Sequence, residues 1–198
     1  MVRELVKVKW LGHACFEIKG KEVTVVTDPH DGASLNIPPP KAQADIVLIS
    51  HTHFDHADGS KLVKKPDAEE IVARTGEFTV KGVKIKGIKT YHDKAMGRQR
   101  GENVVYVFEV DGIRFCHLGD LGHLLSDEQV REIGEVDVLL IPVGGTFTID
   151  AKEAEQIVEL LKPKIVIPMH YKIKGLNLPI AGVEPFIKDK ENVEKLCF

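Results

Sequence analysis

Short apolar runs, each ending in turn residues or polar side chains, divide the chain into predicted strands. Residues 46–49 are uniformly apolar, as in a strand that is buried on both faces. Residues 23–27, 113–119, 137–141 and 164–168 are rich in apolar residues and are also predicted strands. Glycine-containing segments at 19–21 and 111–112 predict two hairpin turns.

Three segments have the spacing of helices. Residues 126–133 begin at Ser126 as N-cap, with Gln129 at the capping-box position. Residues 150–161 are capped by Asp150, carry apolar residues at helical spacing and stop before Pro163. We also expect a helix over residues 60–72, broken near Pro66.

The two halves of the chain can be superposed without gaps. Phe16 aligns with Phe108, Asp28 with Asp120 and Asp45 with Asp137, and each pair gives the same offset (108 − 16, 120 − 28 and 137 − 45 are all 92). The repeat predicts an internal duplication. The expected fold is an α/β, αββα sandwich of two packed mixed sheets with helices on both outer sides, forming a single domain over residues 1–198.

Composition narrows the functional class. The chain has 198 residues, 43% hydrophobic and 29% charged, as a soluble domain with a core requires. A net charge of −3 does not favour nucleic acid or an anionic membrane as a partner. The first residues lack a signal-peptide core, and three cysteines without a CxxC pair predict no disulfide framework. We therefore expect a cytoplasmic protein that acts on a small molecule, with the oligomeric state, a homo-oligomer included, left open.

The segment His51-Thr52-His53-Phe54-Asp55-His56 follows the apolar run 46–49 and places four candidate metal ligands within six positions. Imidazole and carboxylate groups suit Zn²⁺ and similar divalent ions. The two-residue period of a strand puts His51 and His53 on one side, while Asp55 and His56 fall in the following turn. Two ligands for one ion and two for a neighbouring ion is the natural interpretation.

Other candidates also follow predicted strands. His92, Asp120 and His170 each stand at a strand end and are predicted ligands, with Asp120 suited to bridging. Asp28, which aligns with Asp120, is expected to accept a hydrogen bond from a ligand imidazole.

The remaining histidines are weaker candidates. His117 has the wrong parity to share a face with Asp120 and is predicted to be a core residue or a support for the ligands. His13 and His123 could line a pocket or be structural, and His30 is expected at the surface. Where the first half has His51–His53, the second has Gly144 and Gly145, which we expect to leave room and to offer N–H groups to a substrate oxygen.

These motifs resemble those of the metallo-β-lactamase superfamily. The run His51-x-His53-x-Asp55-His56, followed by His92, Asp120 and His170, carries the resemblance across essentially the whole chain. The segments 10–13, 118–120 and 167–170 are most similar to the branch with UlaG-like ascorbate-phosphate lactonases, uncharacterised metal-dependent hydrolases and N-acylphosphatidylethanolamine phospholipase D. Asp120 stands where β-lactamases proper have a cysteine, so lactamase activity is not expected.

The resemblance implies His51, His53 and His92 on one metal, Asp55, His56 and His170 on the other, and Asp120 bridging. The expected cofactors are two divalent ions, Zn²⁺ foremost, with Mn²⁺ or Fe²⁺ as alternatives. Such a pair activates a shared water as hydroxide to attack a carbonyl or phosphorus. Asp55 and Asp120 are the expected catalytic residues, since they can orient the nucleophile or move its proton.

Substrate evidence is limited to residues next to the predicted ligands. The loop 93–102 carries Arg98 and Arg100 and is interpreted either as a flap that binds an anionic ester, lactone or phosphodiester, or as a solvated surface loop. Tyr91 and Tyr171 flank ligands and could line the pocket. An iron-dependent redox enzyme and a non-catalytic metal scaffold are the alternative functions.

Overall fold

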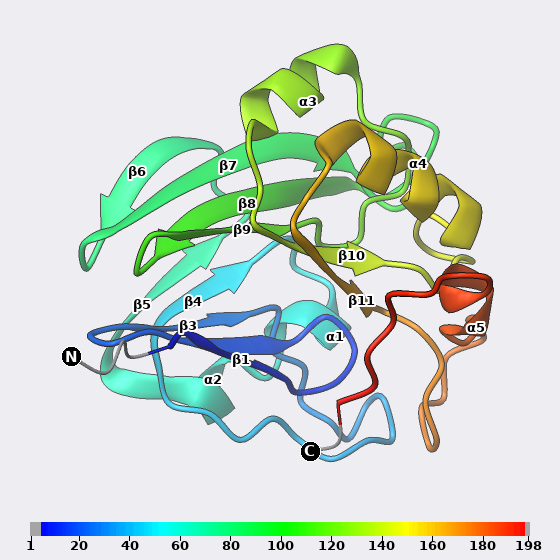
Figure 1. Cartoon of the computed structure of the whole chain (residues 1–198). Helices are drawn as coiled ribbons and strands as arrows, with labels where there is room; N and C mark the ends of the chain where they lie inside the picture. The colour runs from blue at the N-terminus through cyan, green and yellow to red at the C-terminus, as the bar shows by residue number, and fades with distance from the viewer. Residues whose placement is uncertain (1–4, 197–198) are drawn as a thin grey trace.

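A computed structural model of the chain describes residues 5–196. It contains two β-sheets packed face to face (Figure 1). The first sheet has the order β1-β2-β3-β4-β5, with β1 (Lys7–Trp10), β2 (Phe16–Lys19), β3 (Thr24–Thr27), β4 (Ala44–Ile49) and β5 (Lys64–Val72). The second has the order β11-β10-β9-β8-β7-β6, with β6 (Gly76–Val80), β7 (Val83–Tyr91), β8 (Glu102–Val110), β9 (Ile113–His117), β10 (Val138–Pro142) and β11 (Ile165–Met169).

The strands β2 to β5 and β8 to β11 have the same topology. In each set the first pair is antiparallel and the next two pairs are parallel. The aligned aspartates also act alike: Asp45 accepts a hydrogen bond from the N–H of Thr24 at 2.8 Å, and Asp137 accepts one from the N–H of Arg114 at 2.8 Å. The structure thus repeats itself as the offset in the sequence predicts.

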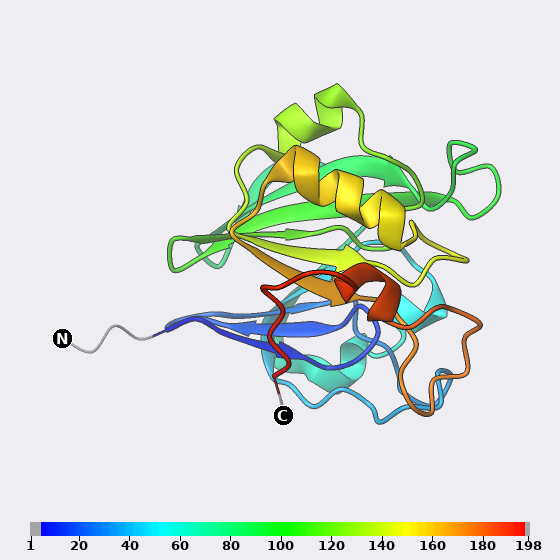
Figure 2. The same cartoon turned by 45° about the vertical axis from the view of Figure 1, so that its right-hand side comes forward.

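Helices cover both outer faces, so the predicted αββα sandwich is confirmed (Figures 1 and 2). The second sheet carries α3 (Asp127–Ile133), α4 (Ala151–Leu161) and the short α5 (Glu184–Ile187), whose apolar side chains join one buried cluster. The first sheet carries α1 (Phe54–Ala57) and α2 (Ser60–Val63), packed on Val26 and Val47. The predicted capping box forms at Ser126 with Gln129, and the predicted N-cap Asp150 forms a second capping box with Glu153.

The main core lies between the sheets, where Phe16 and Leu48 of one sheet meet Phe108 and Leu140 of the other. One buried polar group in this core supports the end of β4. The hydroxyl of Tyr106 donates to the carbonyl of Ile49 at 3.3 Å and accepts from the N–H of Arg74 at 3.0 Å. The strand end that precedes the histidine cluster is thereby held from the opposite sheet.

The predicted helix over residues 60–72 is wrong beyond its first turn. Only Ser60–Val63 is helical, and Lys64–Val72 forms the edge strand β5, parallel to β4. An edge strand tolerates Pro66, which cannot donate to a ladder, and leaves its charged residues in solvent. Ile71 alone is fully buried, so the strand lacks the apolar alternation by which a strand is recognised.

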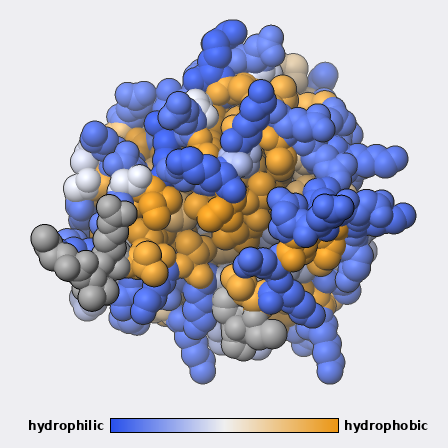
Figure 3. Space-filling model, viewed as in Figure 1, coloured by the Kyte–Doolittle hydropathy of each residue, from blue (hydrophilic) through white to orange (hydrophobic). Residues whose placement is uncertain are grey.

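The face shown in Figure 3 carries an apolar area across its middle. On the edge strands, Val8 and Trp10 of β1 are half-buried, and Ile165 of β11 is 55% exposed. Apolar surface of this kind is common at protein interfaces, and a homo-oligomer stays a prediction. Within residues 5–196 no helix is both long and apolar enough to cross a membrane.

Candidate metal centre

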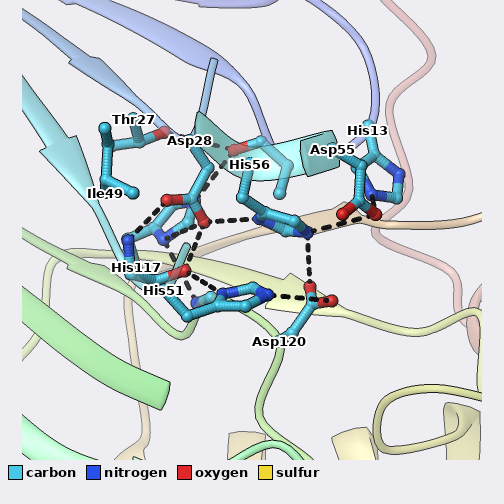
Figure 4. A network of polar contacts seen from close by, with 12 residues as sticks. His13, Thr27, Asp28, Ile49, His51, Asp55, His56, His117 and Asp120 are labelled. Atoms are coloured by element: carbon cyan, nitrogen blue, oxygen red, sulfur yellow. Dashed lines mark hydrogen bonds and ion pairs between the residues drawn. The ribbon is translucent and has the colours of Figure 1, made fainter. Parts of the chain in front are cut away.

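The predicted ligands meet where strands of both sheets end. Figure 4 shows four of them, His51, Asp55, His56 and Asp120. His51 and His53 follow β4, and Asp55 and His56 lie on α1 directly beyond. The remaining three stand just past strand ends: His92 after β7, Asp120 after β9 and His170 after β11. The first half of the chain supplies a continuous segment, and the second half supplies single residues from separate strands.

Sharp backbone turns aim several of these side chains. Asp28, His170 and His13 all adopt positive φ, at 37°, 50° and 54°, although none is glycine. Such conformations cost energy and are concentrated at functional sites. Gly119 has a different function, because a Cβ there would lie 2.4 Å from Oδ1 of Asn103, so only glycine lets the chain enter the site before Asp120.

Two groups of side chains hold the predicted ligands, and the ligand atoms within each group lie within 4.8 Å of one another. The first comprises His51, His53 and His92, and the second comprises His13, Asp55, His56 and His170. A third group, of Asp28, His51 and His56, shares one histidine with each of them. His53 is exposed, whereas the rest are buried, so the first group faces solvent. The composition of the first two groups matches the ligand sets that the sequence resemblance implies, with His13 added.

Asp120 lies between the two groups. Its Oδ2 is 3.0 Å from Nε2 of His92 and 3.3 Å from Nε2 of His170. Its Oδ1 is 3.1 Å from Nε2 of His56. One carboxylate therefore faces histidines of both groups, as a bridging ligand must.

Hydrogen bonds on the far side of three rings fix their orientation. Nδ1 of His51 lies 2.9 Å from Oγ of Ser50, and Nδ1 of His92 lies 3.1 Å from the carbonyl oxygen of Phe147. Nδ1 of His56 lies 2.9 Å from Oδ2 of Asp28, whose carboxylate also accepts from the N–H and the hydroxyl of Ser50. With Nδ1 donating outward, Nε2 is the nitrogen left for a metal.

The charges at this site compensate one another around His56. Burial would lower the pKa of His56, but Asp120, Asp55 and Asp28 together raise it well above its usual value. Burial would raise the pKa of Asp120, but His170 and His56 hold it well below its usual value. By contrast, burial, reinforced by His56, lowers the pKa of His51 to about 3. The site thus holds ionised carboxylates that require positive charge beside them, together with neutral imidazoles that can coordinate.

The donor set fits a divalent metal. Nε2 of His51, Nε2 of His56 and Oδ1 of Asp120 are buried, and none of them makes a hydrogen bond of normal geometry among the described residues, although Nε2 of His56 lies 3.1 Å from Oδ1 of Asp120. Buried polar atoms normally have partners, so three such donor atoms close together fit a bound cation. Nitrogen and oxygen donors in this mixture suit Zn²⁺, with Mn²⁺ or Fe²⁺ as alternatives.

Two histidines outside the predicted ligand set support the structure. His117 is buried, its Nε2 donates to the carbonyl of Ala14 at 2.9 Å, and its Nδ1 accepts from the N–H of Gly119 at 3.1 Å. The expectation that His30 lies at the surface is wrong. It is fully buried, with Nε2 3.1 Å from the carbonyl oxygen of Leu11, because the turn carrying it packs beneath Gly59.

The loop after His92 is organised by Asp93. Its carboxylate accepts four backbone N–H bonds, from Ala95, Gly97, Gln99 and Arg100, at 2.7 to 3.0 Å. These bonds fix the shape of the loop, so a flap movement would carry it as a unit.

The two arginines of this loop differ in direction. Arg98 turns back on its own loop and donates to the carbonyl of Ala95 at 3.1 Å. The guanidinium of half-buried Arg100 lies over the ring of Phe147, 5.2 Å from its centroid. Because Phe147 also holds His92, Arg100 is one residue removed from a predicted ligand.

The glycine prediction needs correction. The N–H of Gly145 donates to the carbonyl of Ile149 at 3.3 Å and is not free for a substrate oxygen. Gly144 does not leave open room either, since a Cβ there would lie 2.1 Å from the carbonyl oxygen of His170. Its function is to let the backbone of His170 approach.

The remaining predicted pocket residues lie in three places. Tyr91 and His123 line a pocket of about 340 Å³ that, within the described chain, shares no residue with either metal group. Tyr171 stacks on Trp10, with centroids 4.9 Å apart. His13 does not line an open pocket, because it is fully buried within the second metal group.

A family model described as a Beta-lactamase superfamily domain matches residues 7–170. A UPF0173 metal-dependent hydrolase of Thermococcus onnurineus is 35% identical over 191 residues, covering 84% of this chain and 85% of that protein. A UPF0173 metal-dependent hydrolase of Thermoplasma acidophilum is 32% identical over 190 residues, covering 85% and 84%.

Among solved structures, a candidate Zn-dependent hydrolase of the metallo-beta-lactamase superfamily from Thermotoga maritima is similar to this chain. It is 48% identical, has a TM-score of 0.76, and is matched over 93% of this chain and 85% of its own. A metallo hydrolase from Ignicoccus hospitalis shares the fold, with a TM-score of 0.65, 24% identity, and coverage of 84% and 83%.

Proposed function

The chain belongs to the metallo-β-lactamase superfamily of metal-dependent hydrolases, and we propose that it is a dinuclear member that hydrolyses a small, anionic ester, lactone or phosphodiester. Membership supports the hydrolase activity. The number of ions and the class of substrate are our proposals and rest on the site itself.

One observation carries the dinuclear proposal. The carboxylate of Asp120 lies between two groups of ligands, 3.0 Å from His92 on one side and 3.1 Å from His56 on the other. A single ion would leave either the His51, His53 and His92 nitrogens or the Asp55, His56 and His170 atoms unpaired in a largely buried site, which is costly.

Bound divalent ions supply a Lewis acid and lower the pKa of water toward neutrality. The chain's own residues then decide where the reaction takes place. Asp120 and Asp55 are ionised acceptors that can hold a nucleophilic water and receive its proton. For both carboxyls, burial acts to raise the pKa, but the neighbouring histidines lower it below its usual value. Exposed His53 marks the side from which a substrate can enter.

Arg100 supports an anionic substrate. Its guanidinium lies over the ring of Phe147, whose carbonyl oxygen contacts His92 of the first metal group, and it is not bound to a carboxylate in the described part of the chain. A guanidinium held in this way is well placed for a carboxylate or phosphate group. Arg98 is tied to its own loop and does not share this position.

Zinc is the proposed metal, because the donor set suits it and the Thermotoga maritima relative is named for it. The test is elemental analysis after reconstitution at neutral pH, followed by a screen of carboxylic esters, lactones and phosphodiesters. Two zinc or manganese ions per chain and turnover of an anionic substrate are expected. One ion per chain would contradict the dinuclear site, and iron with no hydrolysis would favour a redox function.

A further inference from the structure

His13 occupies an unusual position for a residue outside the predicted ligand set. It lies in the loop between β1 and β2, is fully buried and has a φ of +54°, directly after Gly12 at +99°. Two consecutive left-handed residues reverse the chain sharply. As a result, the ring and the carbonyl of His13 both contact residues of the second metal group.

The carbonyl oxygen of His13 holds His170. It accepts the backbone N–H of His170 at 3.0 Å and the indole N–H of Trp10 at 2.9 Å. The ring also packs on the ring of His170, with centroids 4.1 Å apart. His170 directly follows β11, so this contact joins the loop between β1 and β2 to the end of β11.

The ring of His13 holds Asp55. Its Nε2 lies 3.0 Å from Oδ2 of Asp55, and Nε2 of His56 lies 3.7 Å from the same oxygen (Figure 4). His13 therefore contacts two residues of the second group, one through its backbone and one through its side chain.

The unpartnered Nδ1 of His13 indicates that Nε2 of the same ring donates a hydrogen bond and does not coordinate a metal. Nδ1 is buried and has no partner among the described residues. A coordinating Nε2 would require the proton on Nδ1, where nothing accepts it, although a ligating histidine almost always donates through its other nitrogen. A donating Nε2 leaves only a lone pair at Nδ1. The ring of His170 also has an unpartnered Nδ1, but its Nε2 faces Asp120 at 3.3 Å, whereas Nε2 of His13 makes a hydrogen bond of 3.0 Å to Asp55.

We propose that His13 is a positioning residue that assembles the second metal group, by donating from Nε2 to Asp55 and by accepting the backbone N–H of His170. The inference rests on the proposed dinuclear function, since it assigns to that second group a residue outside its ligand set. The carbonyl contact survives any substitution, whereas every side-chain variant removes the ring packing on His170, so the hydrogen bond to Asp55 is isolated by comparing a variant that can donate with one that cannot.

The matched variants are His13→Gln and His13→Leu. Both side chains are unbranched at Cβ and meet the same left-handed backbone, but only glutamine can donate to Asp55. Zinc dissociation constants are measured by competition with a chromophoric chelator, in the full chain and in a His53→Ala background. His53 is exposed, so its removal weakens the first group without disturbing the core.

The leucine variant should bind the second zinc at least about ten-fold more weakly, the low end of the effect of losing an outer hydrogen bond. Its first zinc should be unchanged, and the glutamine variant should stay within about three-fold of wild type. Metal-free thermal unfolding shows whether each variant folds, and His13→Ala replaces leucine if that variant does not.

Three results would overturn the inference. If the glutamine variant binds the second zinc as weakly as the leucine variant, the His13 ring is itself a metal ligand or acts only by packing. Leucine equal to wild type would mean that the contact with Asp55 has no effect. In both of these cases the proposed dinuclear function still holds if the wild-type protein takes up two ions. The third result is a wild-type protein that takes up only one ion, which overturns both the proposed function and this inference.

Discussion

Asp28 and Asp120, which the 92-residue offset aligns, hold opposite nitrogens of one imidazole. Oδ2 of Asp28 lies 2.9 Å from Nδ1 of His56, and Oδ1 of Asp120 lies 3.1 Å from Nε2 of the same ring. The two halves have therefore given equivalent aspartates different functions, one as a support behind the ring and the other facing the candidate metals.

Asp28→Asn should weaken the second metal by about 10- to 100-fold, the usual effect of losing a partner behind a ligand histidine. The charge that orients His56 is lost, although the amide can still accept a hydrogen bond. Asp45→Asn is the matched control, because the Asp45 carboxylate accepts from the backbone N–H of Thr24 and from Nζ of Lys65 at the other end of the sheet. Metal titration measures both variants. Equal losses of metal affinity in Asp28→Asn and Asp45→Asn would show that the effect does not come from the contact of Asp28 with His56.

Asp120→Ala should abolish turnover and remove at least one metal, because this carboxylate faces both groups. His117→Ala should keep both metals. It should lower the free energy of unfolding by about 1–3 kcal/mol, because it leaves the buried Gly119 N–H unpaired, whereas the Ala14 carbonyl still accepts from the hydroxyl of Thr27. Elemental analysis and denaturant unfolding of the two variants check this. If His117→Ala loses metal and Asp120→Ala does not, the assignment of Asp120 as a ligand and of His117 as a structural residue is wrong.

The metal-free protein should be most stable near pH 6.5. Acidic residues raise the pKa values of His56 and His92 against the effect of burial, so the stability they add is present below pH 6.5 and is lost as pH rises. Burial lowers the pKa values of His13 and His51 to about 3, so these residues destabilise the fold as pH falls below 6.5.

Denaturant unfolding between pH 5 and 9, with and without zinc, measures this dependence. Zinc should remove the loss on the alkaline side, because it replaces the proton on His56. Calorimetry in buffers of different ionisation enthalpy should detect that proton on binding. A metal-free stability that keeps rising up to pH 9 would contradict the charge balance inferred around His56.

Arg100→Gln should raise KM for an anionic substrate by about ten-fold, since a charged hydrogen bond contributes about 1.5–3 kcal/mol and 1.4 kcal/mol is a factor of ten. Arg98→Gln should have little effect, because Arg98 donates to its own loop. A neutral analogue and the metal content should be unaffected in both variants. Equal losses for neutral and anionic substrates would show that Arg100 acts on the loop structure alone.

Gly144→Ala should displace His170 and weaken the second metal, because the new Cβ would lie 2.1 Å from the carbonyl oxygen of His170. Gly145→Ala is the control. Its Cβ would lie 3.4 Å or more from its neighbours, so it should cost only about 1–2 kcal/mol for the left-handed backbone at φ +64°. Metal titration and thermal unfolding separate the two effects, and intact metal binding in Gly144→Ala would contradict the close approach.

The part of the site that was predictable follows from local pattern. His51 to His56 stand in one segment after an apolar strand, and His92, Asp120 and His170 each end one, so strand assignment brings them to one edge. His13 was not assigned to the second group, because its direction depends on two positive φ angles that the segment Trp10-Leu11-Gly12 does not reveal.

The errors in the fold have similar physical causes. Residues 64–72 form an edge strand whose charges face solvent, so they lack apolar alternation. Comparison with the repeat could have identified it, since β5 occupies in the first sheet the place of β11 in the second. The free N–H expected at Gly145 is taken up by Ile149, a contact within one loop that residue types alone do not indicate.

The division of ligands between the halves of the chain affects how the protein holds together. His56 comes from the first half and His170 from the second, so an ion bound to both closes a loop of 114 residues (170 − 56). Such an ion restricts the unfolded chain as a cross-link does, and the restriction increases with the length of the loop. Bound ions would thus also act as reversible cross-links between the two halves of the chain, and a chelator would lower the free energy of unfolding together with the activity.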